Sequence, residues 1–182
     1  ELRRNYAHWI REVGVDAFRV DTAFYVPPEF FVDFRLSEDR EAPGVSRVAA
    51  SLGQSDFFLF GEGFGIDAPF EDEATRKIAR YLGKDAATSA LPSMINFPLY
   101  GSLLDVFARG QPTAVLQHRI ASMQQHFPDP HRMPTFIDNH DVDRWLANGN
   151  EAGMKQALLA LMTLPGIPTI YYGTEQGFRQ PR

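Results

Sequence analysis

Hydrophobic and polar residues recur along the chain with two periods, and these predict helices and strands in alternation. Apolar residues spaced three or four positions apart are typical of a helix, and short apolar runs bounded by glycine or proline are typical of strands. The expected helices cover residues 1–13, 45–53, 71–82, 112–127 and 152–164. The expected strands cover residues 17–21, 56–62, 94–97, 133–138 and 168–172. We expect the first of these strands to be buried.

The order of these elements predicts a parallel sheet, because helices that alternate with strands connect parallel neighbours. Such a sheet is either doubly wound or part of a closed barrel. A glycine-rich phosphate loop after the first strand would favour the doubly wound fold, and the sequence has none there. Polar residues stand instead at the carboxyl ends of several strands, where a barrel builds its active site. The expected fold class is therefore the α/β class, as a (β/α)8 TIM barrel.

The length of the chain predicts an incomplete barrel. A complete barrel has eight strands and typically ~250 residues, whereas this chain has 182 residues. We therefore expect residues 1–182 to be a partial (β/α)8 catalytic domain without an internal domain boundary. The remainder of the barrel is expected from missing N-terminal residues.

Two carboxylates at strand ends supply the candidate chemistry. Asp21 and Glu62 each end a predicted strand, and the two strands follow one another along the chain. Adjacent parallel strands lie roughly 4.8 Å apart, so these side chains can approach the ~5–5.5 Å separation that retaining glycosidases use. Arg19 points to the same face as Asp21 and would keep it ionised. The apolar Phe60 beside Glu62 favours the protonated form that a general acid needs.

Four motifs of the chain resemble those of one enzyme family. They are GVDAFRVDTAFYV (14–26), FLFGEGFG (58–65), PTFIDNHD (134–141) and PGIPTIYYGTEQG (165–177). In order and spacing they resemble the second, third and fourth signature regions of glycoside hydrolase family 13, the α-amylase family, and its segment around the last barrel strand. The resemblance runs over essentially the whole chain. It implies that the chain covers about strands 4 to 8 of the barrel.

The resemblance implies a retaining α-glycosidase that acts on α-glucans or related oligosaccharides. Asp21 would be the nucleophile that forms a glycosyl-enzyme, and Glu62 would be the general acid/base. Asp141 would be the third catalytic acid, which binds sugar hydroxyls and stabilises the transition state. Arg19 would orient Asp21, and His140 would bind the substrate sugar.

The segment after the nucleophile departs from the family pattern. Many family members have Lys-His three and four residues after the nucleophile, where they serve sugar and calcium binding, but this chain has Phe24 and Tyr25. Tyr25 is a candidate for stacking on a substrate sugar, with filling of the barrel interior as the alternative. We assign no metal ligand and no certain cofactor, and calcium remains possible in the complete enzyme.

Charge and composition restrict the partners. The chain has 18 Lys and Arg against 23 Asp and Glu, a net charge of −5, so it lacks the basic surface that nucleic acids or anionic membranes attract. The absence of cysteine excludes a disulfide scaffold and thiolate metal sites. We expect an oligo- or polysaccharide substrate, with neither nucleic acid nor membrane as a partner. No compartment is assigned.

Several alternatives stay open at the level of sequence. The same barrel residues suit a transglycosylase or a sugar isomerase of the family, and an inactive fragment or a non-catalytic relative is also possible. Asp67, Glu71, Asp72 and Glu73 are expected to form a solvated helix start, and His118 is expected at the surface.

Overall fold

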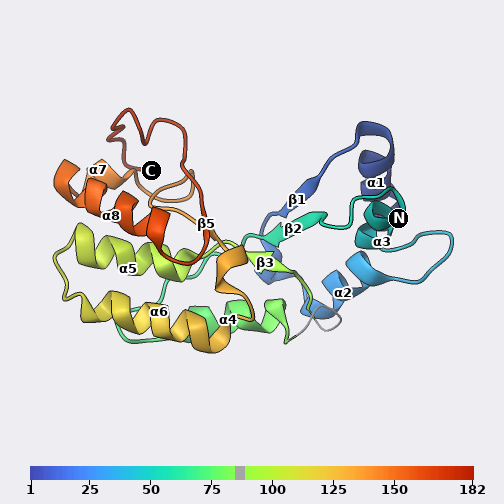
Figure 1. Ribbon diagram of the computed structural model, residues 1–182, viewed down its shortest axis with the longest axis horizontal. Coiled ribbons are helices and arrows are strands. Elements are labelled where there is room, and N and C mark those ends of the chain that lie inside the picture. Colours follow the sequence, from blue (N-terminus) through green and yellow to red (C-terminus); the bar gives the residue numbers. More distant parts are fainter. Residues whose placement is uncertain (85–88) are drawn as a thin grey trace. The chain divides into compact units, whose positions relative to one another are not determined.

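The computed structural model describes residues 1–84 and 89–182, which form two compact units (Figure 1). Unit 1 comprises Glu1–Gly63 and Arg80–Met94, and unit 2 comprises Phe64–Ala79 and Ile95–Arg182. Helix α4 (Glu73–Leu82) begins in unit 2 and ends in unit 1. That residues 1–182 form one partial catalytic domain stays a prediction.

Unit 1 is built on a three-stranded parallel sheet with the strand order β1-β2-β3. Its strands are β1 (Ala17–Val20), β2 (Phe58–Gly61) and β3 (Ser93–Met94). Val20 pairs with Gly61, and Gly61 pairs with Met94. The parallel pairing that the sequence predicted for these strands is confirmed.

Three helices and two short turns complete the described part of unit 1. They are α1 (Leu2–His8), the π-helical turn Trp9–Val13, the 3-10 turn Ala23–Tyr25, α2 (Pro28–Leu36) and α3 (Val45–Ser51). Gly14 ends the first helical segment with a φ of 73°, as predicted, because glycine adopts this left-handed conformation without steric cost. Ile10, Phe34 and Val48 lie in one buried cluster, on which Phe18 of β1 packs.

β1 differs from the buried strand that the sequence predicted. Ala17 and Arg19 are exposed, and Phe18 and Val20 are only half-buried. Among the residues that the structure describes, β1 pairs with β2 alone and therefore lies at the edge of the sheet.

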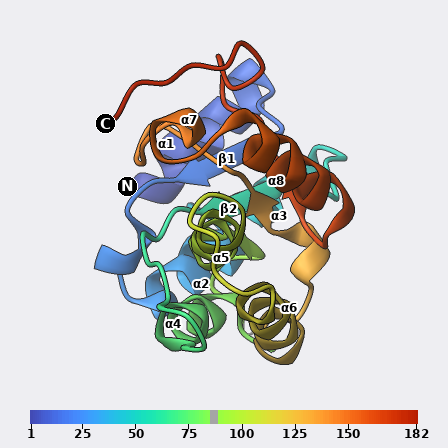
Figure 2. The ribbon, with the colours of Figure 1, turned by 90° about the vertical axis from the view of Figure 1, so that its left-hand side faces the viewer.

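Unit 2 is mainly helical and holds a second, two-stranded parallel sheet. Its elements after α4 are α5 (Phe97–Phe107), α6 (Ala114–His126), the 3-10 turn Pro130–Arg132, β4 (Pro134–Thr135), α7 (Trp145–Asn148), α8 (Glu151–Thr163) and β5 (Ile167–Pro168). Helix α5 lies between α6 and α8 in both ribbon views (Figures 1 and 2) and is buried along nearly its whole length.

Unit 2 differs from the sequence prediction in helices α5 and α7 and in strand β5, and Phe97 begins α5 instead of ending the strand expected over 94–97. Helix α5 was not predicted, because it is apolar on nearly every side and so shows no alternation between a polar and an apolar face. Strand β5 ends at Pro168, so residues 169–172 lie outside the strand expected there. None of the helices in residues 1–84 and 89–182 has the length and apolar character that crossing a membrane requires.

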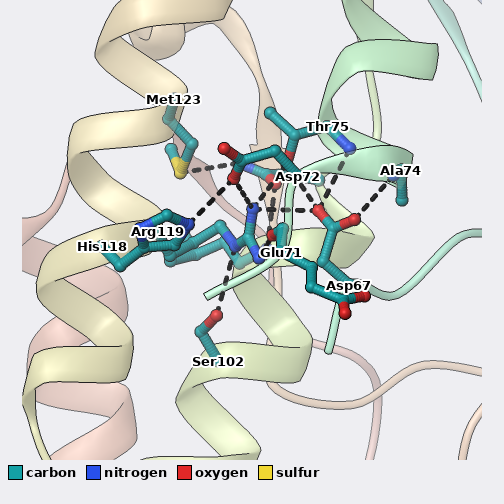
Figure 3. Close-up of polar contacts among 11 residues, drawn as sticks. Asp67, Glu71, Asp72, Ala74, Thr75, Ser102, His118, Arg119 and Met123 are labelled. Atoms are coloured by element: carbon teal, nitrogen blue, oxygen red, sulfur yellow. Dashed lines mark hydrogen bonds and ion pairs between the residues drawn. The ribbon is translucent and has the colours of Figure 1, made fainter. Parts of the chain in front are cut away.

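Arg119 of α6 is the centre of a buried polar cluster in unit 2 (Figure 3). Its Nη1 lies 2.9 Å from a carboxylate oxygen of Asp67 and 3.3 Å from one of Asp72. Its guanidinium also donates to the Thr75 hydroxyl at 2.6 Å and to the Glu71 carbonyl at 2.7 Å. Arg119 thereby connects helix α6 to residues 67–75, which lead into α4 and form its first turn.

Asp67 is both the partner of Arg119 and the cap of helix α4. Its carboxylate accepts the N–H of Ala74 at 2.6 Å and the N–H of Thr75 at 3.1 Å (Figure 3). The first N–H groups of a helix have no partner within the helix, so this carboxylate satisfies them. The prediction of a solvated side chain was wrong for Asp67, which is buried. It was right for Glu71 and Glu73, which are exposed.

Candidate active site

The pairing of β1 with β2 places Asp21 and Glu62 side by side, at the carboxyl ends of these two strands. Val20 pairs with Gly61, so the next residue of each strand is Asp21 in one and Glu62 in the other. The N–H of Glu62 donates to the Val20 carbonyl at 2.6 Å, and the N–H of Ala23 donates to the Glu62 carbonyl at 2.7 Å. The main chain on either side of Asp21 is therefore bonded directly to Glu62.

Asp21 is paired with Arg19 and open to solvent. The Nη2 atom of Arg19 lies 3.1 Å from Oδ1 of Asp21, and 71% of the Asp21 side chain is exposed. Residues two apart on a strand point to the same face, which is why the sequence could predict this pair. The arrangement leaves the carboxylate accessible to a substrate while the guanidinium holds one of its oxygens.

Glu62 is buried, and its carboxylate fixes the turn that follows Asp21. Its Oε2 accepts the backbone N–H of Thr22 at 2.8 Å. Thr22 has a φ of 48°, in the left-handed region, which costs a β-branched residue on the order of 1–2 kcal/mol. The Glu62 side chain thus helps to hold a strained residue next to Asp21. Sequence reasoning missed this contact, because a threonine gives no signal of a positive φ.

The glycines on either side of Glu62 allow close packing around it. A Cβ atom on Gly61 would come within 2.5 Å of the Leu91 side chain, and one on Gly63 within 2.7 Å of the Phe24 ring. A residue with a side chain at either position would therefore displace its neighbours.

Phe24 and Tyr25 lie in the 3-10 turn that follows Asp21. The Phe24 ring packs on Tyr81, with 5.4 Å between ring centroids, whereas the Tyr25 side chain is exposed. The hydrocarbon ring of Phe24 offers no oxygen ligand, so its side chain does not suit a calcium ion. In the described parts of the chain, no group of three or more His, Asp or Glu side chains is arranged to hold a metal ion. Calcium in the complete enzyme and sugar stacking by Tyr25 stay predictions.

His140 and Asp141 lie together in the turn that follows β4 in unit 2. Nε2 of His140 lies 3.2 Å from Oδ2 of Asp141, and the N–H of Asp141 donates to the Asn139 side chain at 2.7 Å. A guanidinium nitrogen of Arg182 donates to the Asp141 carbonyl at 2.8 Å. The His140 ring is exposed and Asp141 is partly exposed, so both can reach a ligand.

A pocket of about 360 Å³ opens beside His140, and aromatic residues form part of its wall. The guanidinium of Arg144 lies 4.1 Å from the ring centroid of Tyr171 and 4.9 Å from that of Tyr172. Partial burial, together with the hydrogen bond and charge of Tyr172, raises the pKa of the Tyr171 phenol above its ordinary value. Aromatic rings and polar side chains, among them His140 and Arg144, therefore line this pocket together.

The predicted site residues thus fall into two groups. Arg19, Asp21 and Glu62 come together in unit 1, and His140 and Asp141 come together in unit 2. That all three acids meet at one site is a prediction.

Comparison with known proteins gives consistent matches. The family model for the catalytic domain of alpha amylase matches residues 1–182. A beta/alpha-amylase of Paenibacillus polymyxa is 33% identical over 185 residues, which cover 96% of this chain and 13% of that protein. A cyclomaltodextrin glucanotransferase of Bacillus licheniformis is 29% identical over 92% of this chain and 20% of that protein.

Solved structures agree with the sequence matches. The chain superposes on an Anoxybacillus alpha-amylase with a TM-score of 0.78 at 26% identity, over 100% of this chain and 36% of that one. The neighbours are TIM-barrel enzymes, so the predicted barrel class is confirmed. The chain spans well under half the length of each of these relatives.

Proposed function

The chain belongs to the α-amylase family, glycoside hydrolase family 13, and from this premise we propose that it is the part of the catalytic barrel that holds about strands 4 to 8 of a retaining α-glycosidase. The proposed substrates are α-glucans or related oligosaccharides. Further residues of the complete enzyme would supply the rest of the barrel. The net charge of −5 supports a carbohydrate rather than a nucleic acid as the partner.

The pairing of Val20 with Gly61 is the observation that carries this proposal, because it places Asp21 and Glu62 next to each other at the carboxyl ends of β1 and β2. In the first step, an Asp21 oxygen would attack the anomeric carbon while Glu62 gives its proton to the leaving oxygen. In the second step, Glu62 would take a proton from water, and that water would release the sugar from Asp21. Both steps invert the anomeric carbon, so the product retains the configuration of the substrate.

Contacts within unit 1 suit these two roles. Arg19 holds Oδ1 of Asp21 at 3.1 Å and so orients the carboxylate that would attack the sugar. The Thr22 N–H donates to Oε2 of Glu62, so the transferable proton would reside on Oε1. The carboxyl group of Glu62 would therefore reach the reaction with a fixed orientation.

Residues of unit 2 and the exposed Tyr25 would bind the sugar. Asp141 would accept hydrogen bonds from sugar hydroxyls and stabilise the positive charge of the transition state. His140, at 3.2 Å from Asp141, would donate to the same sugar. Tyr25 would offer its exposed ring to a sugar face.

The test is the substitution of each proposed catalytic acid in the complete enzyme. We expect Asp21→Asn and Glu62→Gln to lower kcat by about a thousand-fold or more, because each removes a group that acts on the reacting bond. Asp16→Asn is the matched control, since Asp16 is an exposed acid that precedes β1 at the opposite end of the strand. Near wild-type activity of Asp21→Asn or Glu62→Gln would contradict the assignment.

A transglycosylase is the second candidate, favoured by the match to the Bacillus licheniformis glucanotransferase. A sugar hydroxyl would then replace water on the glycosyl-enzyme, with the same acids in the same roles. Mass spectrometry of the products from a defined maltooligosaccharide separates the two. Only shorter sugars would indicate a hydrolase, and longer sugars beside them would indicate a transferase.

A further inference from the structure

We propose that Asp138 is a positioning residue that fixes the turn carrying His140 and Asp141. This inference rests on the proposed function, because it acts through the role of Asp141 at the sugar. Asp138 lies three residues before Asp141 and is 2% exposed, so it does not itself face a substrate.

The carboxylate of Asp138 accepts hydrogen bonds from two segments of unit 2. Its Oδ1 accepts the hydroxyl of Thr174 at 2.6 Å, and its Oδ2 accepts the N–H of Trp145 at 3.1 Å. Trp145 is the first residue after the turn, and Thr174 belongs to the segment that follows β5. The buried Asp138 side chain thus connects the start of the turn to Trp145 at its end, and also connects the turn to the segment that contains Thr174.

Arg144 supplies the positive charge that a buried carboxylate requires. Its Nη1 lies 3.9 Å from Oδ2 of Asp138, its guanidinium stacks on the Tyr171 ring, and its backbone N–H donates to the Gln180 carbonyl at 3.1 Å. The turn is therefore held at its start by Asp138 and at its end by Arg144.

The turn between these two anchors is comparatively open. Within it, Asp141 bonds to the Asn139 side chain and to the exposed His140 ring, and Arg182 reaches it from the end of the chain. Exposed contacts of this kind fix a side chain weakly, because water competes for the same groups. The buried carboxylate of Asp138 is thus the firm support for the position of Asp141.

Substitutions at the two ends of the buried bond test this support in the complete enzyme, with 4-nitrophenyl α-maltotrioside as the substrate. Asp138→Asn keeps the shape of the side chain but replaces the negative carboxylate beside Arg144 with a neutral amide. We expect it to lower kcat by about 10- to 100-fold, with KM within about two-fold. Thr174→Val should lower kcat by a smaller factor, and Thr174→Ser, which restores the hydroxyl, should return it close to wild type.

The same substitution in the Asp141→Asn variant distinguishes a positioning role of Asp138 from a general loss of structure. With Asp141→Asn in place there is no third acid to position, so adding Asp138→Asn should change kcat by less than about two-fold. An equal loss of kcat in both backgrounds would overturn the proposal. If Asp138→Asn does not fold, the Thr174 variants decide, and equal kcat for Thr174→Val and Thr174→Ser overturns it. Wild-type activity of Asp141→Asn alone would instead refute the proposed function.

Discussion

The pair Arg119–Asp67 in unit 2 and the pair Arg19–Asp21 in unit 1 have nearly the same separation, 2.9 Å and 3.1 Å between nitrogen and oxygen. Both side chains of the first pair are 1% exposed, whereas those of the second are 35% and 71% exposed. Water has been removed from the first pair, so each charge depends on the other. Water screens the second pair, which leaves its carboxylate free to meet a substrate.

The comparison shows that the same two residue types serve opposite purposes according to burial. The buried arginine also bonds to Thr75, Glu71 and the Ser102 hydroxyl of α5, so several segments of unit 2 depend on it. The exposed arginine forms its ion pair with the proposed nucleophile, Asp21. Substitution should therefore affect stability in the first case and activity in the second.

The largest expected effect on stability is that of Arg119→Met. It leaves the buried Asp67 without its counter-charge, so we expect a loss of about 3–5 kcal/mol in the free energy of unfolding. Urea denaturation of the complete protein measures this loss. Arg179→Met is the control, because Arg179 forms an exposed pair with Glu151 at 3.1 Å and should change the free energy by less than about 1 kcal/mol. Equal losses in the two variants would contradict the role of burial.

Arg19→Met is the corresponding change in the exposed pair. We expect kcat to fall by about 10- to 100-fold, since the nucleophile loses the charge that orients it. The free energy of unfolding should change by less than about 1 kcal/mol, because the pair is solvent-exposed. Steady-state kinetics and urea denaturation of the same sample measure both quantities. A large loss in the free energy of unfolding with unchanged kcat would show that Arg19 serves stability and not activity, which contradicts the account.

The smallest effect concerns Asp72, at the rim of the buried cluster. Burial alone would raise the pKa of this carboxyl, but the Ser122 hydroxyl, the nearby His118 and the charge of Arg119 together hold it below its ordinary 3.8. A lowered pKa in the folded protein stabilises it above the unfolded pKa, and this stabilisation disappears as the pH falls through the folded value.

Asp72→Asn tests this pH dependence. The variant should have a lower free energy of unfolding than wild type at pH 6, and the difference should shrink as the pH is lowered from about 5 to 3. Urea denaturation at a series of pH values measures it. A difference that stays constant with pH would show that the charge of Asp72 does not contribute.

The sequence could predict the parts of the molecule that depend on local pattern. Asp21 and Glu62 follow apolar runs, and parallel strands bring such positions together, so their neighbouring placement was foreseeable. Arg19 was foreseeable as a partner of Asp21 because the strand period alone sets it on the same face.

Features that depend on packing between distant segments were not foreseeable. Asp67 looks like any acid before a helix, and its burial follows only from Arg119, which lies 52 residues further along the chain. Asp138 likewise lies within the PTFIDNHD motif, which gives no sign that Thr174 would contact it. In each case the partner belongs to another segment, so no pattern within one segment could reveal the contact.

The central claim is that Asp21 forms a covalent bond with the sugar, and a trapping experiment tests it most directly. A fluorinated α-glycosyl fluoride, such as 5-fluoro-α-D-glucosyl fluoride, slows the second step and lets the glycosyl-enzyme accumulate. Peptide mass spectrometry of the complete enzyme then locates the label. We predict the label on Asp21, and a label on any other residue would contradict the assignment.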